Sequence, residues 1–142
     1  MGRCFMQEHE DWLRIAREDL SVARALVKGE FFSAVTYHCQ QSAEKALKGY
    51  LSFKKHEILK SHDLSKLIDL CKKNDRGFDK LYDAADCLNP YATRFRYPTE
   101  FGIPDLADSE QAIKNAESIL RFVLKKITET TTGQQNMFNR SE

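Results

Sequence analysis

The chain has 142 residues, of which 42% are hydrophobic and 30% charged, with only 6 glycines and 3 prolines. So few helix-breaking residues favour helices over a turn-rich sheet, and the length is that of a single domain. The net charge of +1 gives no overall basic field for nucleic acid, and no apolar run reaches the roughly 18 residues that a membrane helix needs. The N-terminus also lacks the apolar core of a signal peptide, so we expect a cytoplasmic protein without a membrane segment.

Hydrophobic residues recur at helical spacing along most of the chain. The spacing predicts helices over about 11–28 and 32–55. A third predicted helix is capped by Ser61 and frays at 74–77, a fourth covers 78–89, and the last begins at 105. An irregular segment with all three prolines separates the last two helices, and no strand-like alternation lasts for more than a few residues. We therefore predict an all-α fold, an up-and-down antiparallel bundle of about five helices with a four-helix core and a short extra helix.

The two ends of the chain are expected to lie outside this bundle. Residues 1–10 are predicted to form an N-terminal extension, and residues 11–128 the helical bundle. Beyond Thr128 the chain becomes polar and its side chains small, which predicts a disordered tail over 129–142.

The predicted second helix has two different faces. Its apolar stripe contains Phe32, Val35, Cys39, Ala43, Ala46, Tyr50 and Phe53. Gln41, Glu44, Lys45 and Lys48 fall on the other side, where Glu44–Lys48 and Gln41–Lys45 are neighbours at i, i+4. This spacing alone favours a solvated face with helical salt bridges.

The alternative is a basic surface that continues past this helix. Between Lys45 and Lys66 there are six lysines against Glu57 and Asp63. Such a local surplus of positive charge suits phosphates or an acidic partner.

Two further segments contain candidate binding residues. His62 opens the third predicted helix, where it could contact a phosphate because helix N-termini attract anions, or could only pair with Asp or cap the helix. In 94–98, two arginines alternate with two aromatic residues. Arginine binds phosphate bidentately and aromatic rings stack on bases, although the same segment could simply be a loop pinned to the bundle.

No motif of a known reaction is readable in the sequence. There is no glycine-rich phosphate loop, no His-Glu-x-x-His zinc motif and no nucleophile elbow. The four histidines are scattered and the four cysteines have no metal spacing, so we predict no metal and no cofactor.

Three motifs, in their order and at their intervals, resemble the HEPN domain. They are Gln40-Gln41-x-x-Glu44-Lys45-x-x-Lys48, Ser61-His62-Asp63-Leu64-x-x-Leu67 and Arg96-Tyr97-Pro98. The resemblance runs from about Asp11 to Ile127, and it implies a bundle of about five helices, commonly a homodimer, with a nucleotide- or RNA-related role. Small prokaryotic members often pair with a separately encoded minimal nucleotidyltransferase in toxin–antitoxin-like modules. This chain lacks the Gly-Ser and Asp-x-Asp signature of the transferase, so the resemblance makes it the HEPN partner.

Many HEPN toxins are metal-independent ribonucleases that carry an arginine followed, four to six residues later, by a histidine. Arg94 and Arg96 lie near the expected region, but no histidine follows them. Arg3 and His9 have the spacing yet lie before the first predicted helix, where the family does not place the motif. The chain thus resembles the branch of the family without the catalytic pair, which favours a non-catalytic protein and leaves enzyme activity open.

We therefore predict a non-catalytic, dimeric HEPN-domain protein that binds a nucleotide or RNA, or docks on a nucleotidyltransferase. The expected ligand- or partner-binding residues are Gln41, Glu44, Lys45, Lys48, Arg94, Arg96 and Tyr97. One alternative is a metal-independent ribonuclease with a divergent site formed by His62 and Arg96. Another is a structural adaptor in which the polar face of the second helix is only a dimer seam.

Overall fold

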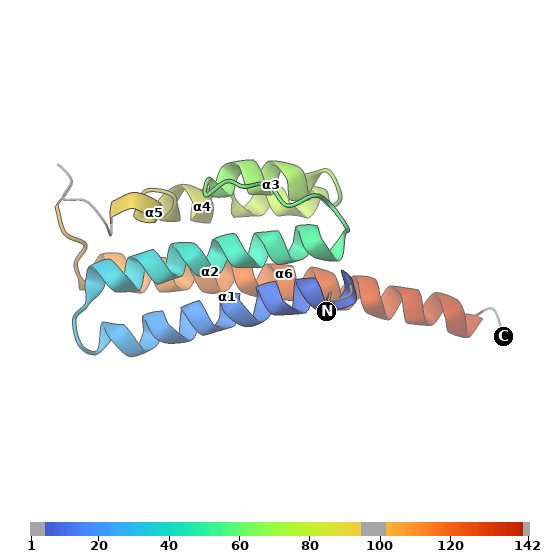
Figure 1. The fold of residues 1–142 in the computed structure, drawn as a ribbon, viewed down its shortest axis with the longest axis horizontal. Helices are drawn as coiled ribbons and strands as arrows, with labels where there is room; N and C mark the ends of the chain where they lie inside the picture. Colours follow the sequence, from blue (N-terminus) through green and yellow to red (C-terminus); the bar gives the residue numbers. More distant parts are fainter. Residues whose placement is uncertain (1–4, 95–101, 141–142) are drawn as a thin grey trace.

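A computed structural model gives the fold (Figure 1) and describes residues 5–94 and 102–140, with side chains over 8–93 and 102–133. Over these residues the chain forms six α-helices and one 3-10 helix, and it contains no strand. The elements are α1 (Phe5–Val27), α2 (Phe32–Phe53), α3 (Leu64–Lys72), the 3-10 helix η1 (Arg76–Leu81), α4 (Tyr82–Leu88), α5 (Tyr91–Arg94) and α6 (Leu106–Arg140). The predicted all-α bundle is confirmed.

The central helix of the bundle is α2, which packs against α1, α3, α4, α5 and α6. As a result, 14 of its 22 residues are buried, far more than one apolar stripe. In Figure 1, α2 lies between α1 and the layer of α3, α4 and α5, with α6 behind it. None of the helices in the described ranges is long and apolar enough to cross a membrane.

The connection between α2 and α3 doubles back along the bundle, so these two helices run in the same direction (Figure 1). Near the start of α3, the carbonyl of His62 accepts a hydrogen bond from Gln40 Nε2 at 3.0 Å. Near its end, Cys71 Sγ donates to the carbonyl of Leu47 at 3.8 Å. Strict up-and-down alternation is therefore broken at this step, and residue 62 lies over the middle of α2.

The N-cap of α3 is Asp63, whereas the sequence predicted Ser61. Asp63 Oδ1 accepts from the Ser65 amide at 2.9 Å, and Ser61 Oγ accepts from the Asp63 amide at 3.1 Å. Asn89, at the end of α4, accepts from the Leu64 amide at 2.8 Å and donates to Asp63 Oδ1 at 3.1 Å. The later cap is favoured because it also joins the start of α3 to the end of α4.

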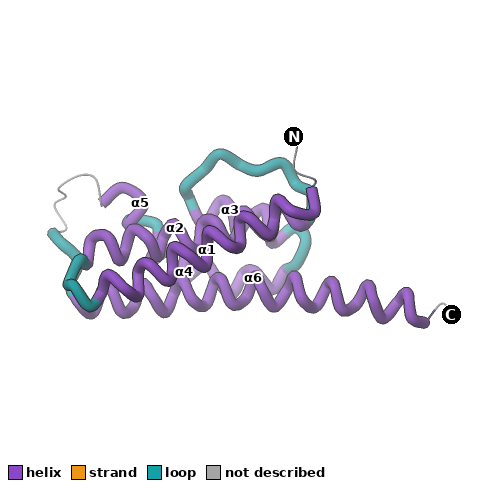
Figure 2. The backbone as a smooth tube through the Cα atoms, turned by 60° about the horizontal axis from the view of Figure 1, so that its bottom comes forward, coloured by secondary structure: helices purple, strands orange, loops and turns teal. Residues whose placement is uncertain are grey.

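Other boundaries differ from the prediction at the two ends of the chain. α1 begins at Phe5, inside the predicted extension 1–10, and α6 continues to Arg140, through most of the predicted disordered tail 129–142. Once a helix is nucleated, each further residue adds a hydrogen bond at little cost, so even polar residues prolong it. Figure 2 shows the last turns of α6 extending beyond the rest of the bundle.

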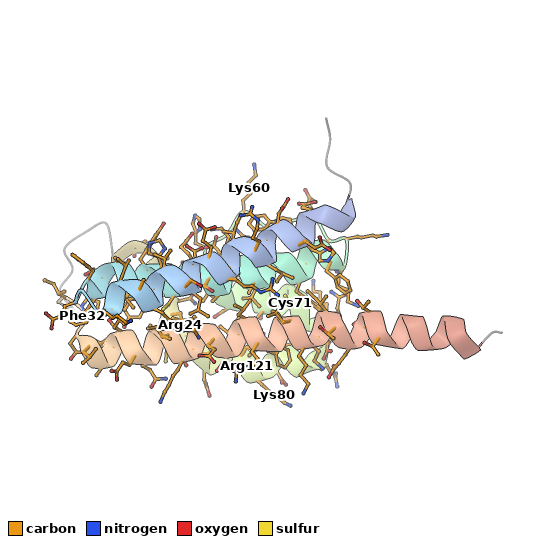
Figure 3. All side chains as sticks on the ribbon, turned by 90° about the horizontal axis from the view of Figure 1, so that it is seen from below. Arg24, Phe32, Lys60, Cys71, Lys80 and Arg121 are labelled. Carbon is orange, nitrogen blue, oxygen red and sulfur yellow. The ribbon has the colours of Figure 1, made fainter. Side chains whose placement is uncertain are left out.

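The buried core takes in residues of α1, α2, α3, η1, α4 and α6, and an aromatic cluster lies where α2, η1 and α6 meet. The rings of Tyr50 and Phe78 lie 4.5 Å apart between centroids, and Phe78 packs edge-on against Phe122 at 4.9 Å. On the opposite side of the bundle, α1 and α6 lie side by side and are joined by an ion pair of 2.9 Å between Arg24 and Glu117 (Figure 3). The first and last helices of the chain, α1 and α6, thus pack against one another in the bundle.

Gly49 is a position at which α1 closely approaches α2. A Cβ atom at this position would lie 3.1 Å from Leu13 Cδ2 and 3.2 Å from Trp12 Cβ. A glycine inside a helix costs about 1 kcal/mol relative to alanine, and here this cost allows the close approach.

We expect Gly49→Val to lower the free energy of unfolding by about 1–3 kcal/mol, because its branched side chain must push α1 away from α2. Urea denaturation followed by circular dichroism measures this change. Gly133→Val is the matched control, since Gly133 also lies in a helix but has no atom within 4 Å of the added Cβ. Equal stability of the two variants would show that the α1–α2 contact does not limit the size of residue 49.

Candidate ligand-binding site

The polar face of α2 is largely covered, not solvated. Glu44 and Lys48 keep only 2% and 7% of their surface exposed, and Gln40 is fully buried. The ring of Trp12 on α1 lies 5.8 Å from Lys48 Nζ. The interpretation of this face as a solvated row of salt bridges is therefore wrong for Glu44 and Lys48, because α1 on one side and the returning 54–63 connection on the other enclose them.

Glu44 is the centre of the buried network. Its Oε1 lies 2.9 Å from His62 Nδ1, and its Oε2 lies 3.1 Å from Lys48 Nζ. Burial by itself would raise the pKa of Glu44, but the hydrogen bonds to His62 and Lys48 outweigh this effect and lower the pKa below its ordinary value of 4.5. The carboxylate is therefore ionised at neutral pH.

A chain of hydrogen bonds connects this carboxylate to the edge of the site. Lys45 Nζ donates to Gln41 Oε1 at 2.8 Å, and Gln41 Nε2 donates to Gln40 Oε1 at 2.7 Å. Gln40 Nε2 then donates to Glu44 Oε1 at 3.4 Å. Gln40 had no predicted role, although its i, i+4 spacing to Glu44 was the available signal. Because each side chain is oriented by its neighbour, the network is rigid.

His62 is the exposed end of this network. Its side chain is 75% exposed, although Nδ1 is bonded to a buried carboxylate. An ionised carboxylate only accepts hydrogen bonds, so Nδ1 donates in this contact. Nε2 has no hydrogen-bond partner among the described residues and faces outward from a ring of fixed orientation. The acidic partner of His62 is thus Glu44 of α2, whereas the sequence suggested pairing with Asp or a capping role, and the N-cap of α3 is Asp63.

The structure brings together five of the predicted site residues, which are Gln41, Glu44, Lys45, Lys48 and His62. Arg94 is the last residue of α5, a single turn that packs against α2, but its side chain lies outside the described residues. Arg96 and Tyr97 also lie outside them. Asn89 was not among the predicted residues, and it fixes where α5 starts relative to His62 through its bonds to the first residues of α3.

A second histidine–carboxylate pair lies between α1 and α2. His38 Nδ1 is 2.9 Å from Asp19 Oδ1, and both side chains are partly buried. His38 lies one and two turns before Gln41 and Lys45 on the same face of α2. In the described ranges, no group of three or more His, Cys, Asp or Glu side chains is placed to hold a metal ion.

We expect Glu44→Gln to lower the free energy of unfolding by about 2–4 kcal/mol at pH 7, since it leaves the buried Lys48 ammonium without its counter-charge. The folded-state pKa of Glu44 is lowered, so its contribution is complete above the unfolded pKa near 4.5 and is lost as the pH falls through the folded value. The difference between wild type and Glu44→Gln should therefore shrink below pH 4.5 in denaturant titrations.

Glu18→Gln is the control for this measurement, because Glu18 forms an exposed pair with Arg14 at 3.8 Å. Its effect should stay below about 1 kcal/mol at every pH. A Glu44→Gln effect that is equally small, or that grows on acidification, would contradict the paired-carboxylate description.

Three comparisons with known proteins agree with this fold. A model of the HEPN domain matches residues 9–127, close to the range of the sequence resemblance. A protein of Methanocaldococcus jannaschii named "Putative toxin MJ1304" is 28% identical over 129 residues, which cover 79% of this chain and 83% of that protein.

Two solved structures are similar over most of their length. The crystal structure of TT1696 from Thermus thermophilus has a TM-score of 0.72 and 27% identity, covering 84% of this chain and 98% of that one. The crystal structure of ST0689, described as an archaeal HEPN homologue, has a TM-score of 0.70 and 28% identity, covering 89% of this chain and 99% of that one. The matching domain takes in the α2 network and the start of α3, and this chain belongs to the HEPN domain family.

Proposed function

We propose that this chain is a toxin-like HEPN-domain protein that binds the phosphate of a nucleotide or RNA around His62 without cleaving it. The toxin-like role follows from family membership and from the name of the Methanocaldococcus jannaschii relative. The binding role is carried by one observation, the 75% exposed His62 ring held by the 2% exposed Glu44 carboxylate. Burying a charge costs free energy, and here the buried carboxylate of Glu44 orients an imidazole that is exposed to solvent.

The surroundings of His62 suit an anion. Its ring precedes the N-terminus of α3, where the helix dipole favours negative charge. Lys45 lies on the same network and is only half-buried, so its ammonium group adds a positive contact. Arg94, Arg96 and Tyr97 continue from α5 and, on this proposal, extend the same surface with guanidinium and aromatic contacts.

Binding is favoured over cleavage because, within the described residues, His62 is bonded to no second acid or base that is exposed. Proton transfer to a leaving group normally needs a second titratable side chain within hydrogen-bond reach. The described residues give His62 only Glu44, which is buried behind the ring, and Lys48 is engaged by Glu44 on the side away from His62.

We also propose that the protein acts as a homodimer and pairs with a minimal nucleotidyltransferase. Both proposals rest on the family and on the toxin-like relative. The half-buried residues of the α1–α2 face, among them His38, Gln41 and Lys45, offer a polar surface on which a second subunit could pack. On this proposal a ligand at His62 would lie beside that surface.

We expect His62→Ala and Lys45→Ala each to weaken binding of ATP, GTP or a short RNA by about tenfold, because each removes one charged or polar phosphate contact. The double variant Arg94→Ala with Arg96→Ala should weaken it at least as much. Isothermal titration calorimetry at fixed salt measures these affinities.

His56→Ala is the matched control for this titration. His56 is an exposed histidine of the same 54–63 connection, but its ring contacts Asn74 and no carboxylate. Its affinity should remain within about twofold of wild type. If wild type binds none of the three ligands at millimolar concentration, the dimerising-adaptor function replaces this proposal.

RNA cleavage is the second candidate function, and the Glu44–His62 contact is the observation that favours it. In such a reaction, His62 Nε2 would take the proton of a ribose 2′-OH. The 2′ oxygen would attack phosphorus, the bond to the 5′ oxygen would break, and that oxygen would gain a proton. Glu44 would hold the imidazolium in place, much as a carboxylate does in a hydrolase triad.

We expect purified wild-type protein, incubated with RNA and a chelator, to cleave no faster than His62→Ala. Gel electrophoresis of an end-labelled RNA, with a 2′-deoxy substrate as the control, measures the rates. Cleavage that is lost in His62→Ala and lowered in Glu44→Gln, both shown to be folded, would make the protein a ribonuclease.

A further inference from the structure

A second concave site lies at the other end of α3. Asp69, Lys72, Lys73, Arg76 and Tyr82 line a hollow of about 210 Å³ between the C-terminal end of α3, η1 and the start of α4. Neither the motifs of the sequence nor the network around Glu44 includes these residues. Three of the five are cations.

The three cations of this hollow have no carboxylate partner in the part of the chain that the structure describes. Among the described residues, Lys72, Lys73 and Arg76 form no ion pair within 4.0 Å. Nearby cations do find partners, as Lys126 does with Asp75 at 3.1 Å. With Asp69 as the only acidic lining residue, the lining carries three positive charges and one negative, a surplus of two.

The carboxylate of Asp69, which lines the hollow, already has a hydrogen-bond partner. Asp69 accepts a hydrogen bond from the hydroxyl of Tyr82, and this bond raises the pKa of Tyr82 to about 12, so the phenol stays neutral. Lys72 Nζ lies 5.2 Å from the centroid of the same ring. The Tyr82 side chain therefore contacts Asp69 through its hydroxyl and Lys72 through its ring.

Helix-end electrostatics explain only part of this cluster. Lys72 and Lys73 lie in the last turn of α3 and at its C-cap, where cations offset the negative end of the helix dipole. Arg76 belongs to the next element and satisfies no carbonyl of α3, yet its side chain lines the same hollow. Asp79 of η1 also acts on Tyr82, and counting it still leaves a surplus of one positive charge.

We infer that this hollow is a second anion site, which binds the phosphate of a nucleotide or of an oligonucleotide through Lys72, Lys73 and Arg76. Arg76 supplies a planar fork, the two lysines supply point charges, and Tyr82 forms an aromatic wall. The nine residues of α3 separate the hollow from His62 by about 13 Å at 1.5 Å per residue. The inference rests on the hollow's own residues and does not require that His62 bind a ligand.

Titration of ¹⁵N-labelled full-length protein, followed by ¹H–¹⁵N NMR at 150 mM salt, tests the site directly. The three probes are inorganic phosphate, ATP and a 5′-phosphorylated RNA tetranucleotide. We expect saturable shifts of the amides of residues 72–76 and 82 with ATP or with RNA. Saturation by ATP alone identifies a free nucleotide as the ligand, and saturation by RNA identifies its backbone phosphate.

Two double variants separate a built site from general positive charge. Lys73→Ala with Arg76→Ala should weaken the binding at least tenfold. Lys66→Ala with Lys80→Ala also removes two positive charges, but from exposed positions on α3 and η1 outside the hollow. This control should change the affinity less than twofold. Figure 3 shows the side chain of Lys80 projecting from the edge of the molecule.

The inference is overturned if both double variants weaken binding equally, or if no probe shifts these amides at 10 mM. His62→Ala should leave the shifts of 72–76 and 82 unchanged. A protein that binds here but not at His62, or the reverse, would thus separate this inference from the proposed function.

Discussion

The buried carboxylate of Glu44 is the constraint on which the rest of the structure depends. An ionised group at 2% exposure is tolerated only when its charge is paired and its oxygens are hydrogen-bonded. Lys48, one turn further along α2, supplies one partner at 3.1 Å, and His62 supplies the other at 2.9 Å. Since the second partner lies 18 residues away, the chain must return from the end of α2 to its middle before α3 begins.

This return determines how the smaller helices are placed. α3 starts beside the middle of α2 and runs parallel to it, and Asn89 then joins the end of α4 to the first residues of α3. α5 follows directly and packs against α2. The two ends of α3 consequently differ, with an oriented imidazole before one end and, around the other, three cations that have no ion-pair partner among the described residues.

Much of the helical core was predictable because periodicity depends on local backbone geometry. Val35, Cys39 and Tyr50 are buried as their spacing indicated, and Gly49 marks a close helix contact. The start of α3 was predicted two residues early, because both Ser61 and Asp63 are able to cap a helix and only Asn89 distinguishes them. The polar face of α2 was misjudged for a related reason, since spacing shows which residues share a face but not whether another segment covers it.

The sequence by itself determined the helical class, the bundle core and the family, since these depend on spacing along the chain and on ordered motifs. It also placed Glu44 and Lys48 one turn apart, which makes them neighbours on the surface of any helix. Only the tertiary structure decided that this pair is buried, that His62 completes it, and that Gln40 connects it to Lys45. The physical reason is that burial and long-range pairing depend on the path of the 54–63 connection, which no local propensity specifies.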